Sequence, residues 1–318
     1  MYKLGIDLGG TNIVAGVVDD EYKIVGTAKR KTDMPRSAEK IVDDMAAVAV
    51  EAAENAGITL DDIESMGIGS PGAVDPENGV ITYANNLDFH NVPICEMMFE
   101  RTGRKFYLEN DANAAAYGEY IAGAGKGTEN FIAITLGTGV GGGIIINGRI
   151  YSGSNYAGAE LGHTVIQMNG ERCTCGRNGC FEAYASATAL IRQTKQAMIR
   201  YPESVMWELC DGNIEAVSGM TAFKGMREGD YAAKRVVDGY IGYLAVGIAN
   251  MINIFQPDVL CIGGGISHEG DALILPLRDI VEGEDYARNI ERRTVIKAAT
   301  LGNDAGIIGA ACLCNLYK

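Results

Sequence analysis

The chain has 318 residues, a formal net charge of −14, 47% hydrophobic residues and 21% charged residues. This hydrophobic content is enough for a sizeable core, and the length predicts about two domains. The negative charge argues against nucleic acid or an anionic membrane surface as a partner, although backbone amides can still hold a small anion. Neither a signal peptide nor an apolar run of the roughly 18 to 20 residues that span a bilayer is found, so we expect a cytoplasmic protein.

The first segment, residues 3–29, predicts two apolar strands around a glycine-rich turn and then a further strand. Asp7, Gly9, Gly10 and Thr11 form the turn. Because glycine has no Cβ, the backbone amides of such a turn can approach a phosphate closely. An ordinary hairpin is the alternative, which this motif alone does not exclude.

The next stretch predicts alternating helices and strands. Residues 37–55 have helical apolar spacing, with Ser37 as the expected N-cap. Further elements are expected over 63–69 (strand), 93–101 (helix), 105–109 (strand) and 112–121 (helix). Asn110 and Asp111 lie where the last of these strands meets the last helix, which is a place from which a carboxylate can project into a site.

The opening pattern then returns. The run Ile134-Thr135-Leu136-Gly137-Thr138-Gly139 matches Ile6-Asp7-Leu8-Gly9-Gly10-Thr11 loosely in spacing, and an apolar strand flanks each run on both sides. We interpret this repeat as a duplicated domain with two hairpins that face each other across a cleft. The duplication favours phosphate binding by both turns.

A cluster of metal-binding residue types follows. Cys173, Cys175 and Cys180 form a C-x-C-x4-C pattern, and His163 lies ten residues upstream of the first cysteine. These four residues suit tetrahedral zinc of the Cys₃His kind. Three reduced cysteines and an unrelated histidine are the alternative. Since the other five cysteines lie mostly among apolar neighbours, we expect them to be core thiols.

The last part of the chain continues the α/β alternation. Expected elements are helices over 186–200 and 230–255, a strand over 257–262, a strand over 293–299 and a closing helix over 304–316. Gly263-Gly264-Gly265 follows the first of these strands, and a strand–glycine–helix order fits the approach of a nucleotide. We expect a small N-terminal domain of residues 1–112 plus 300–318 and a larger domain of residues 113–299 that contains the zinc loop.

Seven motifs occur together and in order. They are DLGGTN at 7–12, SPG at 70–72, ENDANAAAYGE at 109–119, LGTGVGGG at 136–143, GAELGH at 158–163, CTCGRNGCFE at 173–182 and GGGIS at 263–267. From Ile6 to about Leu313 the chain resembles the ROK family of sugar kinases and repressors, and among its members the bacterial ROK glucokinases. The resemblance implies a duplicated actin-like ATPase (ribonuclease H-like) fold with two domains, ATP between the hairpins and a hexose in the interdomain cleft.

The resemblance also implies roles for individual residues. The ATP and phosphate contacts would come from Asp7, Gly9, Gly10, Thr11, Asn12, Thr138, Gly139, Gly264 and Gly265, with Mg²⁺ at Asp7. The hexose contacts would come from Gly72, Asn86, Asn110, Asp111, Glu160, His163 and Glu182. Asp111 would be the general base that accepts the proton of the sugar 6-hydroxyl, and a helix N-cap is its alternative role. Structural Zn²⁺ would bind His163 and the three cysteines, and the other ring nitrogen of His163 is free to donate to sugar.

The expected function is therefore an ATP-dependent glucokinase that forms glucose 6-phosphate, and the family suggests a homodimer. ROK glucokinases often read N-L-P-G-W where this chain has Asn86-Leu87-Asp88-Phe89-His90, which leaves N-acetylmannosamine, allose or fructose as alternative substrates. A sugar-responsive repressor would need a helix-turn-helix segment ahead of Ile6, where only five residues precede it. The intact Asp111 and both glycine turns argue against a non-catalytic sugar-binding module.

Overall fold

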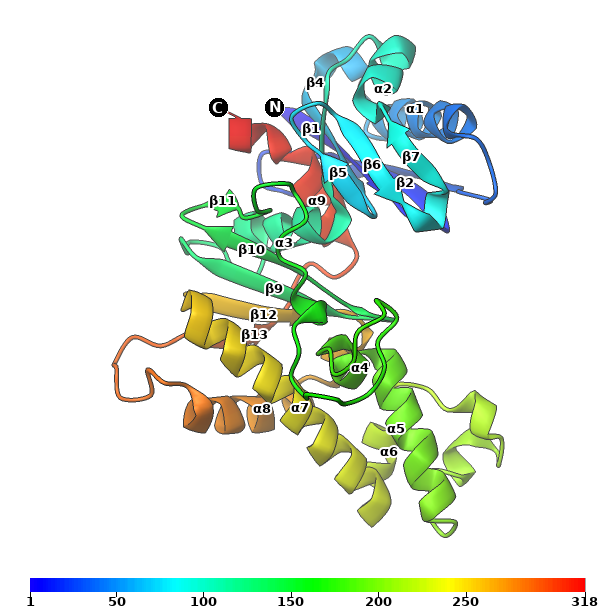
Figure 1. The fold of residues 1–318 in the computed structure, drawn as a ribbon. Helices are drawn as coiled ribbons and strands as arrows, with labels where there is room; N and C mark the ends of the chain where they lie inside the picture. Colours follow the sequence, from blue (N-terminus) through cyan, green and yellow to red (C-terminus); the bar gives the residue numbers. More distant parts are fainter. Residues whose placement is uncertain (318) are drawn as a thin grey trace. The chain divides into compact units, whose positions relative to one another are not determined.

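The computed structural model describes residues 1–317, which form two compact units. Unit 1 contains Met1–Ile132, Gly143–Ala159 and Thr300–Lys318, and unit 2 contains Ala133–Gly142 and Glu160–Ala299. These five stretches alternate, so the chain passes between the units four times (Figure 1). Compact units need not coincide with the products of a duplication, and the division into domains 1–112 plus 300–318 and 113–299 stays a prediction.

Unit 1 is built around a five-stranded sheet. Its helices and main strands are β1 (Tyr2–Leu8), β2 (Asn12–Val18), β3 (Ile24–Lys31), α1 (Ala38–Asn55), β4 (Ile63–Ser70), α2 (Ile94–Thr102), β8 (Phe106–Asn110), α3 (Asp111–Ala122) and α9 (Asp304–Ala311). The strand order is β3-β2-β1-β4-β8. The first three strands are antiparallel neighbours, whereas β4 runs parallel to both β1 and β8. All these elements lie close to their predicted bounds except the closing helix.

A small second sheet of unit 1 was not predicted from the sequence. It consists of β5 (Ala73–Asp75), β6 (Val80–Ala84) and β7 (Phe89–Val92), in the order β5-β6-β7. These strands are short, and a left-handed residue, Asp88, precedes the last of them. Their alternation is therefore too brief to give a periodic signal in the sequence.

Three glycines in register carry α9 on the first sheet. Gly5 pairs with Gly16 on β2 and with Gly67 on β4. A Cβ on Gly5 would lie 1.9 Å from Ile307 O, and a Cβ on Gly67 would lie 2.0 Å from Ala310 O. Because this row has no side chains, the α9 backbone packs directly on β1 and β4, and the side chain of Ile307 packs on Gly16 of β2.

The closing helix is shorter than predicted. Helix α9 ends at Ala311, and a 3-10 helix over Leu313–Tyr317 follows it, so the prediction of one helix over 304–316 was wrong at its C-terminal end. Its small residues do allow the close packing that was expected. A Cβ on Gly309 would lie 1.7 Å from Ala114 O of α3, so the two helix backbones are in direct contact.

The second large sheet repeats the strand order of the first. Its strands are β9 (Phe131–Leu136), β10 (Val140–Ile146), β11 (Arg149–Ile150), β12 (Val259–Gly263) and β13 (Val295–Ala298). The order is β11-β10-β9-β12-β13, in which each strand takes the place of its counterpart in β3-β2-β1-β4-β8. This repetition is what the duplicated glycine hairpins in the sequence predict.

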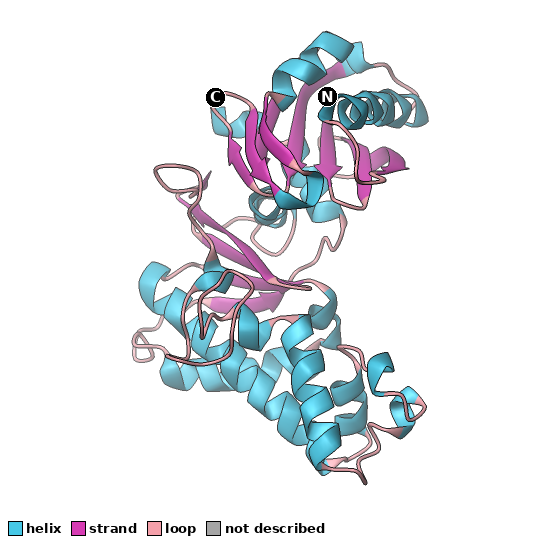
Figure 2. Cartoon of the chain, turned by 45° about the vertical axis from the view of Figure 1, so that its right-hand side comes forward, coloured by secondary structure: helices cyan, strands magenta, loops and turns pink. Residues whose placement is uncertain are grey.

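Unit 2 is mainly helical (Figure 2). Its helices are α4 (Glu182–Ala185), α5 (Ala187–Arg200), α6 (Thr221–Arg227), α7 (Tyr231–Phe255) and α8 (Asp271–Glu284). Tyr240 of α7 is fully buried and donates a hydrogen bond of 2.7 Å to Ala185 O. Tyr243 of the same helix is 36% exposed and packs against Tyr184 with ring centroids 4.6 Å apart.

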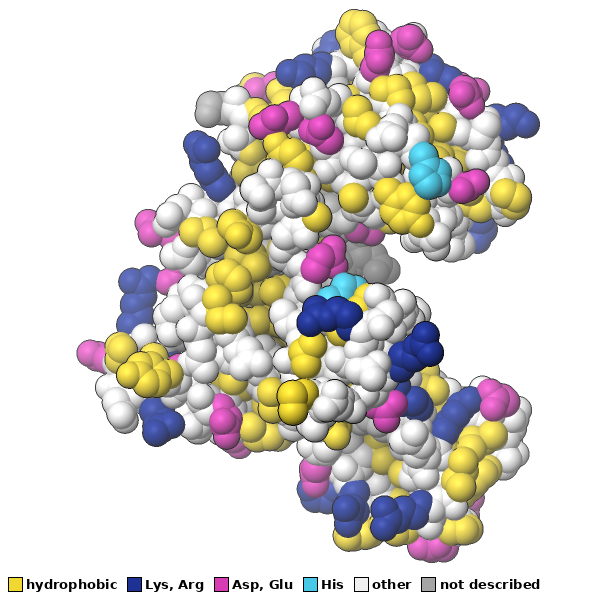
Figure 3. Space-filling view, viewed as in Figure 1, with side chains coloured by type: hydrophobic (Ala, Val, Ile, Leu, Met, Phe, Trp, Pro, Cys, Tyr) yellow, Lys and Arg dark blue, Asp and Glu magenta, His cyan; other side chains and the backbone are white. Residues whose placement is uncertain are grey.

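In the part of the chain that the structure describes, no helix combines the length and apolar character that crossing a bilayer requires. On the face drawn in Figure 3, basic and acidic side chains are interspersed with apolar ones.

Candidate functional site

The first glycine turn, Gly9–Thr11, joins β1 to β2 and is held by Thr32, the residue that follows β3. Gly9 N–H donates to Asn12 O at 2.9 Å, which closes the turn. Thr32, which is fully buried, donates its hydroxyl to Gly9 O at 2.6 Å and its N–H to Thr11 O at 3.0 Å. The two bonds from Thr32 hold the turn by the carbonyl groups of Gly9 and Thr11, whereas phosphate binding would use the N–H groups of Gly10 and Thr11.

Two carboxylates of unit 1 lie near this turn. Asp7 is the last residue but one of β1, two residues before Gly9, and Asp111 is the first residue of α3. Burial raises the pKa of Asp7 to about 6, and the charge of Asp111 adds to the rise. Burial also raises the pKa of Asp111 above its usual range. The two groups therefore repel each other in a poorly solvated place, which is the environment in which a divalent cation and a proton acceptor are useful.

The end of β8 fixes the position of Asp111. Asn110 is the N-cap of α3, and its Oδ1 accepts from the N–H groups of Ala112 at 2.9 Å and Asn113 at 3.2 Å. Its Nδ2 donates to Gly72 O at 3.0 Å, so the cap residue also holds the loop after β4. The cap is thus Asn110, and Asp111 accepts one bond from Ala112 N–H at 2.8 Å.

Asn86 lies beside the first glycine turn. It is in a 3-10 helix over Asn85–Leu87, and a Cβ placed on Gly10 would be only 3.1 Å from Asn86 Cβ. Of the residues that replace Pro-Gly-Trp, Phe89 is buried in the core of unit 1, whereas His90 is exposed and packs on Tyr83 at 5.1 Å between ring centroids. Gly72, Asn86, Asn110 and Asp111 thus all belong to unit 1.

The second glycine turn, Gly137–Gly139, joins β9 to β10 and is held by the segment around α4 and α5. Ala187 N–H donates to Gly137 O at 2.8 Å, and Thr188 Oγ1 donates to Thr138 O at 2.8 Å. A Cβ on Gly139 would lie 2.3 Å from Glu182 Oε2, so glycine leaves room for that oxygen. This turn therefore lies against Glu182.

A third glycine run lies beside the same hairpin. Gly264 has φ 83°, and a Cβ on it would lie 2.4 Å from Leu136 O at the end of β9. Gly265 begins a 3-10 helix over Gly265–Glu269 and has open space at its Cβ position. Thr138, Gly139, Gly264 and Gly265, which were predicted to contact nucleotide, are thus brought together within unit 2.

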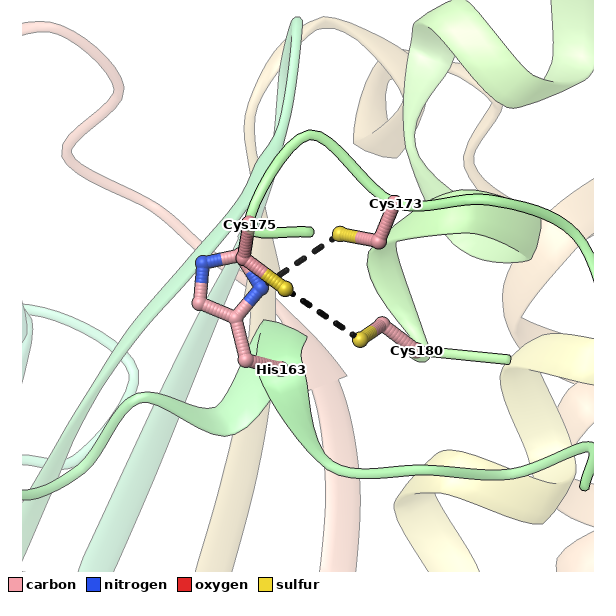
Figure 4. Close-up of side chains that lie close together, drawn as sticks. All are labelled: His163, Cys173, Cys175 and Cys180. Atoms are coloured by element: carbon pink, nitrogen blue, oxygen red, sulfur yellow. Dashed lines mark hydrogen bonds between the residues drawn. The ribbon is translucent and has the colours of Figure 1, made fainter. Parts of the chain in front are cut away.

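Four side chains converge in the loop between β11 and α4 (Figure 4). The ligand atoms of His163, Cys173, Cys175 and Cys180, here called the Cys/His cluster, all lie within 4.8 Å of one another. Cys173 Sγ is 3.7 Å from His163 Nδ1, and Cys175 Sγ is 3.6 Å from Cys180 Sγ. Ligands of a tetrahedral zinc with bonds of about 2.0–2.3 Å lie about 3.5–3.8 Å apart, so these residues fit zinc.

Two carboxylates flank the cluster. Glu160 is exposed and precedes a 3-10 helix over Leu161–His163. Glu182 begins α4, and both of its carboxylate oxygens have partners inside unit 2. Glu160, His163 and Glu182 therefore belong to one loop system, and their contacts to a hexose stay a prediction.

No role was assigned to Glu119 from the sequence. Its carboxylate nevertheless accepts more hydrogen bonds than that of Asp7 or Asp111. Its side chain is 3% exposed and accepts from Ala124 N, Thr300 N and Leu301 N at 2.7–2.9 Å. It therefore ties the end of α3 to the segment that enters α9. Nothing local marks this role, since two of its partners lie about 180 residues away.

Comparison with known proteins gives matches over nearly the whole chain. The model of the ROK family matches residues 3–316. A glucokinase of Thermotoga maritima is 39% identical over 311 residues, which are 98% of this chain and 96% of the relative. A putative xylose repressor of Caldicellulosiruptor sp. is 31% identical over 278 residues, which are 87% of this chain and 69% of the relative.

A solved structure has a similar fold. The crystal structure of a ROK family glucokinase from Streptomyces griseus, in complex with glucose and AMPPNP, superposes with a TM-score of 0.81. The two sequences are 38% identical, and the match covers 98% of this chain and 99% of that one.

Proposed function

Since the chain belongs to the ROK family and has its mixed α/β, actin-like ATPase fold, we propose that it is an ATP-dependent glucokinase, a phosphotransferase that forms glucose 6-phosphate. The observation that carries this proposal is the match to glucokinases over almost the full length of both chains. The match covers 96% of the Thermotoga maritima glucokinase and 69% of the putative xylose repressor of Caldicellulosiruptor sp..

The proposed chemistry places the proton acceptor at the start of α3. Asp111 accepts the proton of the 6-hydroxyl as that oxygen attacks the terminal phosphorus of ATP, and the bond from this phosphorus to the bridging oxygen breaks to release ADP. Its raised pKa, which is due to burial, makes it a stronger base than an exposed aspartate. Asn110 supports this role because its cap to α3 and its bond to Gly72 O fix the backbone on both sides of the acceptor.

Phosphate binding is assigned to the glycine turns. Gly9, Gly10, Thr11 and Asn12 of unit 1 and Thr138 and Gly139 of unit 2 offer N–H and hydroxyl groups, and Gly264 and Gly265 are assigned to the nucleoside. When bound at Asp7, Mg²⁺ supplies positive charge that offsets the negative charge of the phosphates. The raised pKa of Asp7 is consistent with a carboxylate that ionises fully only beside a cation.

Hexose binding is assigned to Gly72, Asn86 and Asn110 of unit 1 and to Glu160, His163 and Glu182 of unit 2. Carboxylates, amides and imidazole suit this role because sugar hydroxyls both donate and accept hydrogen bonds. Zinc held by His163, Cys173, Cys175 and Cys180 would give a rigid loop, since it leaves no ligand position open for water. The spacing of these ligand atoms supports that assignment.

The test is a phosphorylation assay with a panel of hexoses that includes glucose, N-acetylmannosamine, allose, fructose and mannose, and with ATP, ADP and polyphosphate as donors. We expect ATP-dependent phosphorylation with the highest kcat/KM for glucose. A different preferred hexose would replace glucose while keeping the kinase assignment. Absence of phosphorylation of every hexose would reject the enzyme and favour a sugar-binding regulator.

Two further parts of the proposal concern the oligomeric state and the cellular location. The homodimer that the family suggests predicts a mass of twice 33.8 kDa in light scattering. A cytoplasmic location is supported by the proposed zinc site, since Cys173, Cys175 and Cys180 have to stay reduced to bind metal, as they do in a reducing compartment.

A further inference from the structure

Glu182 stands between the Cys/His cluster and the second glycine turn. Its Oε1 accepts from Thr174 Oγ1 at 3.2 Å and lies 3.6 Å from Cys173 Sγ. Its Oε2 accepts from Val140 N–H at 3.0 Å. One carboxylate group therefore contacts a ligand residue of the cluster on one side and the first residue after the glycine turn on the other.

The second glycine turn is in contact with Glu182 at Gly139 and with the residues after Glu182 at Gly137 and Thr138. Gly139 leaves room for Oε2, because a Cβ there would lie 2.3 Å from that oxygen. The residues that follow Glu182 along the chain hold the rest of the turn, since Ala187 N–H bonds Gly137 O and Thr188 Oγ1 bonds Thr138 O. Every one of these partners belongs to unit 2.

The cluster also fixes the position of Glu182 at the start of α4. Cys180 is a ligand residue of the cluster, and Glu182 is the second residue after it, at the start of α4. Phe181 N–H donates to Thr164 O at 2.8 Å, next to His163, so both ends of the loop meet just before Glu182. A change in the geometry of the cluster must therefore move the carboxylate that bonds Val140.

We propose that Glu182 is a positioning residue that couples the Cys/His cluster to the second glycine turn, so that the metal-loaded cluster sets the affinity of this turn for the phosphates of a nucleotide. The inference rests on the proposed function, because it takes Gly137–Gly139 as a phosphate-binding turn. It adds to the assigned role of Glu182 toward a hexose, and it predicts an effect of the metal when no sugar is present.

The test measures ADP binding by calorimetry without hexose, in the zinc-loaded protein and after zinc has been removed with a chelator. We expect removal to weaken ADP binding about ten-fold, the size of one hydrogen bond to a charged group. In Glu182→Ala with zinc retained, ADP binding should fall by about the same factor, and chelation should then add less than about two-fold. Adenosine binding should change by less than about two-fold throughout, because it makes no phosphate contact.

Three further variants separate positioning from general loosening. Glu182→Gln should bind ADP within about three-fold of wild type, since its Oε1 can still accept from Val140 N–H. Thr188→Val should weaken ADP binding but keep the response to chelation, because it alters the turn and leaves the cluster intact. Glu171→Gln is the matched control, since Glu171 lies in the same loop but faces Arg192 at 3.9 Å, and it should behave as wild type.

The outcomes that overturn the inference are distinct from those that reject the function. ADP binding that is indifferent to zinc and to Glu182→Ala would overturn only the coupling, and so would a wild-type protein that contains no zinc. Equal weakening of ADP and adenosine would overturn it as well, because it would indicate general loosening. Absence of any ADP binding by the zinc-loaded wild type would reject the proposed function together with the coupling.

Discussion

At the scale of single residues, the surroundings of Asp111 and Asp7 raise the pKa of both carboxyl groups. Both are half-buried carboxylates near the same turn, and the charge of Asp111 makes ionisation of Asp7 less favourable. Such a pair is costly for the folded protein but useful for chemistry that binds a cation and removes a proton. Replacing each carboxylate by an amide tests the two roles separately.

Replacing Asp111 by Asn should lower kcat for glucose by about 10² or more, because a positioned general base contributes roughly that factor. The Asn side chain can still accept from Ala112 N–H, so binding of glucose and of ATP should stay near the wild-type level. Steady-state kinetics and calorimetry check the two parts. Asp271→Asn is the matched control, since Asp271 also begins a helix. Wild-type turnover in Asp111→Asn would remove this residue from the mechanism.

Replacing Asp7 by Asn should stabilise the metal-free protein at neutral pH. The folded-state pKa of Asp7 is about 6 against 3.8 for the model group, so the folded protein binds this proton more tightly than the unfolded chain does. Stability is therefore lost as the pH rises from about 4 to about 6, and the cost is complete at pH 7. We expect Asp7→Asn to raise the free energy of unfolding by about 1–3 kcal/mol at pH 7 and by little at pH 4.

Urea unfolding at the two pH values measures this difference. The exposed Asp33 offers a control, because Asp33→Asn should change stability by about the same small amount at both pH values. A gain in Asp7→Asn that is as large at pH 4 as at pH 7 would show that the charge is not the cause.

Residue roles were predictable from the sequence where a motif carries them and not elsewhere. The cysteines and His163 have metal-ligand spacing, and the structure brings their ligand atoms within 4.8 Å of one another. Glu119 has no such signal. Its acceptor role depends on Thr300 and Leu301, which approach it only once the chain has folded.

At the scale of elements, the contact between α3 and α9 is one of backbone against backbone. Gly309 of α9 lies where a Cβ would be 1.7 Å from Ala114 O. Gly309→Ala should therefore force the helices apart and destabilise the protein by about 1–3 kcal/mol or more. Gly242→Ala in α7 is the matched control, since no atom lies within 4 Å of its Cβ position.

The control substitution should raise stability by about 0.5–1 kcal/mol, because alanine is the better helix former. Thermal unfolding should show a lower melting temperature for Gly309→Ala and a higher one for Gly242→Ala. A similar change in both variants would mean that helix propensity, and not the approach to α3, decides the effect at Gly309.

Elements with long periodic patterns were predictable, and short or irregular ones were not. Helix α7 has 25 residues and lies within one residue of its predicted start, because its apolar spacing persists over many turns. Strands β5 to β7 have only three to five residues each. The end of α9 at Ala311 is also invisible in the sequence, since Cys312 and Leu313 continue the apolar pattern.

At the scale of the whole molecule, metal binding should contribute to folding, because the four ligand residues belong to a loop with little regular structure. Metal analysis should find about one zinc per chain. Cys175→Ser should lose this zinc, lower the melting temperature and impair glucose binding. Cys95→Ser, which alters a cysteine outside the cluster, should retain it. A zinc-free wild type with full activity would contradict the structural role.

The row of Gly5, Gly16 and Gly67 under α9 has a consequence for the order of events during protein synthesis. These strands leave the ribosome early, but the helix that covers them is translated only after the whole of Glu160–Ala299. Until then one face of the nascent sheet lacks its cover and exposes bare backbone and apolar neighbours, which is a surface that chaperones bind. A ribosome stalled before Thr300 should therefore hold an N-terminal segment that proteases cut readily, whereas release of the full chain should make the same segment resistant.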